Sequence, residues 1–158
     1  MKTLLKTILV GAVLAAAGVA LAAGPPDPVV GTWTLNVAKS KFDPGPAPKS
    51  QTRTYSVDAD GVSLSVTGVG ADGAAISQES TFKYDGRAYA MKGAADYDAI
   101  SLKQVDANTV KSTMMKAGKP VGTTTRTISA HGKVLTLATK AADANGKPYD
   151  NVAVYDKQ

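Results

Sequence analysis

Two arginines stand at the centre of the same three-residue pattern, each within a segment of strand-like composition. The segments are Thr52-Arg53-Thr54 and Thr125-Arg126-Thr127. A guanidinium carries a permanent charge and several N–H donors, so an arginine inside a protein can pair with a carboxylate or stack on an aromatic ring. An arginine on the outer face would instead lie in water between its threonines. The two orientations depend on strand register, and both remain open at this point.

The other ionisable residues do not form a recognisable catalytic or metal-binding pattern. His131 is the sole histidine and precedes Gly132, which indicates an exposed turn and no general base. Glu79 is the only glutamate, and strand alternation turns it towards water. With one histidine and no cysteine the chain offers no zinc site, and its Asp-rich turns lack the ligand spacing of a calcium loop. We therefore predict no enzyme, no bound metal and no cofactor.

Short turns of the Asp-Gly and Asn-Gly type divide the chain into segments that would position the arginines. The segments alternate with a period of two residues, are rich in Thr, Val and Tyr, and show no sustained helical period. About ten strands are expected, beginning near residues 29, 50, 61, 74, 87, 97, 108, 120, 133 and 148. Sequential hairpins of this kind predict an all-β fold, an antiparallel up-and-down barrel of about eight to ten strands.

Two further sequence patterns, a repeated hairpin and a proline-rich segment, add to the barrel prediction. The hairpin that contains Arg53 resembles the one that contains Arg126, either through internal duplication or because hairpins converge on the same residue types. The segment from Lys39 to Lys49 holds Pro44, Pro46 and Pro48 and is expected to be an extended loop outside both helix and sheet.

The N-terminus predicts export. A basic start, an apolar stretch and the small residues Ala20-Leu21-Ala22 are typical of a secretory signal peptide over residues 1–22. Residues 23–158 then form one domain with no integral membrane span, located in the periplasm or secreted. The 18 basic and 13 acidic residues are spread along the chain, which argues against nucleic-acid binding. We expect a monomer.

The motif Gly31-Thr32-Trp33 resembles the first strand of the calycin group, which comprises the lipocalins and the intracellular fatty-acid-binding proteins. The resemblance implies that Gly31 and Trp33 close one end of the barrel, with an arginine from a late strand packed against the indole. The ending Val154-Tyr155-Asp156-Lys157 is similar to the last strand of fatty-acid-binding proteins. The whole mature chain also resembles a group of small secreted bacterial proteins, which supports the predicted boundaries and leaves the function open.

These patterns favour a non-enzymatic, lipocalin-like barrel that holds a small hydrophobic, amphipathic or anionic ligand. Arg53 and Arg126 are the candidates for anion pairing, and Tyr55, Tyr89 and Met91 for lining the lumen. The alternative is an envelope interaction module or inhibitor whose barrel or sandwich core is filled, because bulky residues are few. Its contact surface would be the proline segment.

Overall fold

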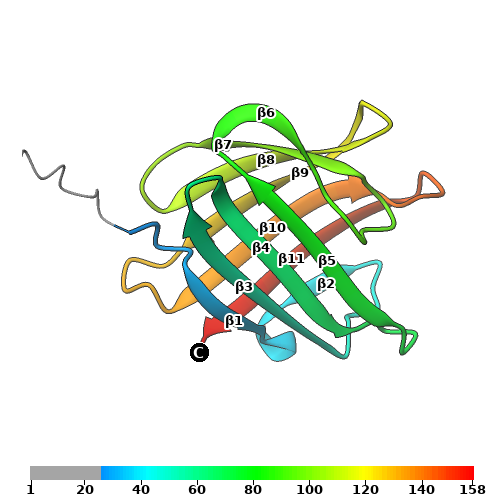
Figure 1. Cartoon of the computed structure of the whole chain (residues 1–158). Coiled ribbons are helices and arrows are strands. Elements are labelled where there is room, and N and C mark those ends of the chain that lie inside the picture. The colour runs from blue at the N-terminus through cyan, green and yellow to red at the C-terminus, as the bar shows by residue number, and fades with distance from the viewer. Residues whose placement is uncertain (1–25) are drawn as a thin grey trace, which may run out of the picture.

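The computed structural model describes residues 26–158, which form one antiparallel sheet wrapped around a single interior (Figure 1). The predicted signal peptide, residues 1–22, lies outside the described residues. The strands are β1 Gly31–Leu35, β2 Lys41–Asp43, β3 Ser50–Asp58, β4 Gly61–Val69, β5 Ala75–Phe82, β6 Asp85–Ala90, β7 Ala99–Gln104, β8 Thr109–Lys116, β9 Lys119–Ile128, β10 Val134–Ala142 and β11 Pro148–Lys157. The ten longer strands begin within two residues of the predicted positions, and the all-β barrel prediction is confirmed.

The barrel is nearly closed. Its strands follow the order β5-β4-β3-β1-β11-β10-β9-β8-β7-β6, so the two ends of the sheet, β5 and β6, face each other. The seam is a single bridge in which Glu79 and Lys92 exchange main-chain hydrogen bonds of 3.1 and 2.9 Å. Ser80 adds a hydrogen bond from its hydroxyl to the Ala90 carbonyl at 2.8 Å. This bridge brings the two edges of the sheet together at one point, so the sheet curves around the interior as a nearly closed barrel.

Aspartate side chains hold the turns between strands. The Asp58 carboxylate accepts hydrogen bonds from the backbone N–H groups of Asp60 and Gly61, at 2.9 and 3.2 Å. Gly61 has φ +133°, a conformation that side chains rarely adopt. The Asp143 carboxylate makes the matching pair of bonds to Asn145 and Lys147 in the turn between β10 and β11. The turn chemistry expected from the sequence therefore fixes the hairpins.

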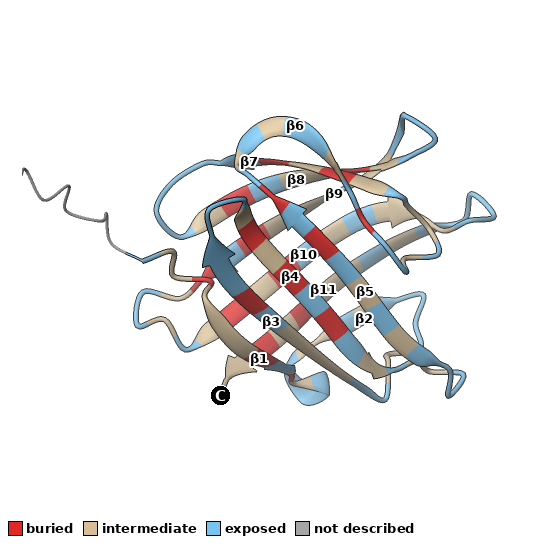
Figure 2. Cartoon of the chain, viewed as in Figure 1, coloured by how far each residue is buried: buried red, intermediate tan, exposed pale blue. Residues whose placement is uncertain are grey.

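Alternation along each strand divides the barrel into a buried inner face and a hydrated outer face (Figure 2). Trp33 is fully buried, and its indole Nε1 donates to the Val29 carbonyl at 2.7 Å. Val29 itself is fully buried, and the N–H of Val30 donates to the carbonyl of Asp27. The segment before β1 thus packs with Trp33 as part of one core.

The proline segment differs from its prediction at its start. Residues Val37–Lys39 form a short 3-10 helix, η1, and β2 then pairs with β11, with Phe42 opposite Asn151. The prediction of no sheet pairing from Lys39 onwards was wrong, because the residues of β2 precede the first proline and keep their N–H groups. Residues 44–49, which hold Pro44, Pro46 and Pro48, lie outside the strands as expected.

No helix within residues 26–158 has the length and apolar character needed to cross a membrane.

Candidate functional site

The interior holds a cavity of about 260 Å³. The expectation of a filled core, on which the alternative function rested, therefore does not describe this barrel. Arg53, Tyr55, Met91 and Arg126, which are four of the candidate residues, all line the cavity. They come from β3, from the segment after β6 and from β9, so the fold brings together residues that are far apart in the chain.

Arg53 points into the cavity from β3. Its Nε donates to the Tyr155 hydroxyl and its Nη1 to the Tyr55 hydroxyl, both at 3.3 Å, and its guanidinium carbon lies 5.5 Å from the centre of the Tyr155 ring. The Arg53 side chain is half-buried, and it lines the cavity. Nη2 makes no hydrogen bond within residues 26–158, so this nitrogen is available to a bound group.

The charge of Arg53 is stable in this setting. Burial lowers the pKa of Arg53, but the negative charge that Tyr155, Tyr55 and Tyr97 carry once they ionise, together with the hydrogen bond to Tyr155, raises this pKa above its ordinary value. The guanidinium therefore stays cationic at every pH at which the protein is folded.

Arg126 lies deeper and is held more firmly. It is 6% exposed, and its Nη2 donates to the Tyr84 hydroxyl at 2.7 Å. That hydroxyl in turn donates to the Asp27 carboxylate at 2.6 Å. The guanidinium carbon also lies over the rings of Tyr55 and Tyr84, at 5.6 and 5.4 Å. Arg126 thus ties β9 to the N-terminal segment through Tyr84.

Neither arginine has a carboxylate partner. Within residues 26–158 the ion pairs join Lys39 to Asp156, Arg87 to Asp85 and Lys140 to Asp150, and all six side chains are more than a third exposed. Arg126 keeps its buried Nε without any hydrogen bond. Buried charges are usually paired, because an unpaired charge in a protein interior costs several kcal/mol. The lumen therefore carries an excess of positive charge.

The two walls of the cavity differ in chemistry. Beside Arg53, the Tyr155 hydroxyl donates to the side-chain oxygen of Gln51 and continues the polar wall formed by β3 and β11. In the strand order β7 and β8 lie across the barrel, and their contribution is largely apolar. The apolar residues of that wall are Ile100, Leu102, Val110 and Met114. Such a cavity suits a molecule with one polar and one apolar side.

The cavity opens towards an outer hollow of about 340 Å³. Four residues line both spaces and mark the mouth between them, namely Phe42, Asp96, Tyr149 and Asn151. The Asp96 carboxylate accepts a hydrogen bond from the Ala144 N–H at 3.0 Å and so joins two loops at the mouth. Burial, with the nearby Asp96, raises the pKa of Tyr149 to about 12, so this phenol is neutral at physiological pH.

One predicted lining residue is placed elsewhere. Tyr89 pairs with Ile100 and packs against the core, but it does not line the cavity, and its hydroxyl donates to exposed Asp85 at 2.8 Å. A register shift between Asp85 and Ala88 disturbs the pairing of β6 with β7, at the edge of the sheet. Such bulges redirect side chains, and this one accounts for the wrong placement.

Sequence reasoning also missed part of the lining. Gln51, Tyr97, Tyr149 and Tyr155 all line the cavity. Alternation within β11 places Tyr149 and Tyr155 on one face, so a register for that strand relative to β3 would have identified them.

Trp33 and Gly31 lie beside Lys157, and their role in closing one end of the barrel stays a prediction. Trp33 does not line the cavity and belongs to the fully buried core. The cation over its ring is Lys157, 5.0 Å from the ring centre, in place of the arginine implied by the resemblance. Gly31 has φ +130°, and a Cβ there would meet the Lys157 side chain at 2.8 Å. A glycine at this position therefore lets Lys157 cover the tryptophan.

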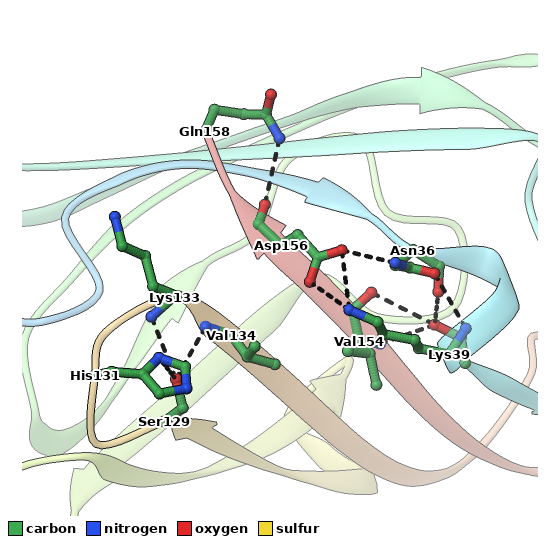
Figure 3. A network of polar contacts seen from close by, with 10 residues as sticks. Asn36, Lys39, Ser129, His131, Lys133, Val134, Val154, Asp156 and Gln158 are labelled. Atoms are coloured by element: carbon green, nitrogen blue, oxygen red, sulfur yellow. Dashed lines mark hydrogen bonds and ion pairs between the residues drawn. The ribbon is translucent and has the colours of Figure 1, made fainter.

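A serine and a histidine meet in the turn after β9 (Figure 3). The Ser129 hydroxyl shares a hydrogen bond of 3.1 Å with Nδ1 of His131. The same oxygen accepts from the backbone N–H groups of Lys133 and Val134, so it holds the turn. His131 is exposed, as predicted, and no carboxylate of residues 26–158 orients its ring.

Metal ligands are not grouped either. Within residues 26–158 no three His, Asp or Glu side chains are placed to hold a metal ion.

No family model matches the chain, and no curated protein matches it. Among solved structures, the barrel is similar to zebrafish ileal bile acid-binding protein in a crystal structure with cholic acid. The TM-score is 0.50 and the identity 12%, over 83% of this chain and 99% of that one. The likeness supports a calycin-type barrel of the kind found in fatty-acid- and bile-acid-binding proteins, and at this identity it shows the fold alone.

Proposed function

We propose that the protein binds a small amphipathic anion inside its barrel and does not act as an enzyme. The observation that carries the proposal is Arg53, a guanidinium that faces the cavity with no carboxylate partner and with one nitrogen unengaged. An anion beside Nη2 would supply the missing counter-charge. A charge-assisted hydrogen bond of this kind is about twice as strong as a neutral one.

Arg126 also lines the cavity and would add to the positive electrostatic potential that attracts the anion. It is engaged by Tyr84, so we assign it a supporting electrostatic role and not the direct contact. The apolar wall of β7 and β8 would take the hydrocarbon part of the ligand. The bound acid of the similar barrel, cholic acid, also combines an acidic group with a large apolar body, which is consistent with this class of ligand.

The place of action belongs to the proposal as well. The predicted signal peptide supports export, so we infer that the protein meets its ligand in the periplasm or outside the cell.

Isothermal titration calorimetry tests the proposed function with straight-chain acids, cholate and alcohols of equal length. The shorter straight-chain acids are expected to bind the wild-type protein with a one-to-one stoichiometry, at least tenfold more tightly than the matching alcohols, and cholate reports whether a bulkier acid enters the same cavity. Arg53→Met should remove that tenfold preference. The control is Arg87→Met, since the Arg87 side chain is 82% exposed. Failure of every acid to bind would contradict the proposed function.

A further inference from the structure

The size of the cavity restricts the ligand further. We propose that the barrel selects acids with a short apolar body, of about eight to ten carbon atoms, over long-chain lipids. This inference rests on the proposed function and narrows it from amphipathic anions in general to one size class.

The first step is the volume. A water molecule takes about 30 Å³ in the liquid, and a methylene group is of similar size. The cavity of about 260 Å³ therefore accommodates roughly nine such groups. A sixteen-carbon acid needs roughly twice that space.

The second step is the position of the acid group. Arg53 and the hydroxyls of Tyr55 and Tyr155 lie within the cavity, not at its mouth. An acid held by Arg53 has its hydrocarbon part beside Ile100 and Met114 across the lumen. The charged end and the apolar body thus share one small space.

The third step is the boundary of that space. Methylene groups that pass the mouth enter the outer hollow, which is lined by Asp96, Asp143, Lys147 and the exposed Pro44 and Pro46. This hollow is open and polar, so hydrocarbon placed there stays largely hydrated. Only the part of the chain inside the barrel gains from burial.

A chain-length series tests the size limit. Acids of six to sixteen carbons are titrated into the full-length mature protein by calorimetry, each below its micelle concentration. The dissociation constant should fall about fourfold for each added methylene up to about ten carbons and then stop falling. A fall that continues to sixteen carbons would overturn the size limit while leaving the proposed function intact. If no acid binds, it is the proposed function itself that fails.

A cavity variant makes the same test from the protein side. Met114→Ala removes roughly two to three methylene equivalents from the wall. The chain length at which the dissociation constant stops falling, here called the break, should therefore increase by about that number of carbons. Met115→Ala is the matched control, because Met115 does not line the cavity. A break that stays in place in Met114→Ala, or moves equally in both variants, would contradict the proposal. If Met114→Ala fails to fold, the wild-type series still decides.

Discussion

The two Thr-Arg-Thr segments place the same residue in opposite situations. Arg126 in β9 is 6% exposed and has a 2.7 Å hydrogen bond to Tyr84, which continues to Asp27. Arg53 in β3 lines the cavity, has two bonds of 3.3 Å to tyrosines and makes no hydrogen bond through Nη2 within residues 26–158. Arg126 is thus held by one short hydrogen bond and keeps a buried Nε without a partner, whereas Arg53 is held by two longer hydrogen bonds beside the cavity.

This difference separates the arginine to which we assign a structural role from the arginine that we propose binds the ligand. The chain from Arg126 through Tyr84 to Asp27 joins the barrel wall to the segment that packs under Trp33. Arg53 contributes no comparable link between elements beyond its tyrosines. A buried charge without a counter-charge costs stability, and we propose that Arg53 offsets this cost by binding the ligand.

The largest effect on stability is expected from Arg126. Arg126→Met removes the charged hydrogen bond to Tyr84 and two ring contacts, so the free energy of unfolding should fall by about 2–3 kcal/mol. Arg53→Met should change it by less than about 1 kcal/mol, because its two bonds of 3.3 Å are longer than the 2.7 Å bond of Arg126 and its side chain is only half-buried. Urea unfolding of both variants measures the difference.

Exposed Arg87 again provides the control, with an expected change within about 0.5 kcal/mol for Arg87→Met. If Arg53→Met lowers the free energy of unfolding more than Arg126→Met does, the assignment of the structural role to Arg126 is contradicted.

A smaller effect is expected from Tyr84→Phe. The variant leaves Nη2 of Arg126 and the Asp27 carboxylate without their shared partner, at a cost of about 1–2 kcal/mol near pH 7. Burial raises the pKa of Tyr84; Arg126 opposes the shift and the hydrogen bond to Asp27 adds to it. The stability that the neutral phenol provides is therefore complete below about pH 10 and is lost as the pH rises above that value.

Urea unfolding near neutral pH and above about pH 10 checks this sign. The difference in stability between wild type and Tyr84→Phe should shrink in the alkaline range. A difference that grows with pH would show that the Tyr84 phenol does not hold Arg126 as its neutral form.

The strands were predictable because local chemistry determines them. Aspartates such as Asp58 and Asp143 bond to their own turns, and alternation between turns does not depend on distant residues. The orientation of Arg53 and Arg126 was not predictable, since it depends on how β3 and β9 pair with their neighbours. The sequence identified the two arginines as the candidates without distinguishing their roles.

The errors have the same origin. Tyr89 is displaced from the cavity beside the irregularity in β6, and β2 forms because β11 offers a partner to Phe42. Lys157 covers Trp33 where an arginine was expected, because the last strand pairs directly with β1. Each outcome follows from a contact between segments that are far apart in the chain.

The most direct test of Arg53 as the anion receptor is the ionisation of a bound acid. Octanoate labelled with ¹³C at its carboxyl group can be titrated by NMR in complex with wild type, Arg53→Met and Arg126→Met. In wild type and Arg126→Met the pKa of the bound carboxyl group should lie below that of free octanoate, because a guanidinium favours the carboxylate. In Arg53→Met this lowering should disappear. A bound carboxyl group whose pKa is at or above the free value in the wild-type protein would contradict the role of Arg53.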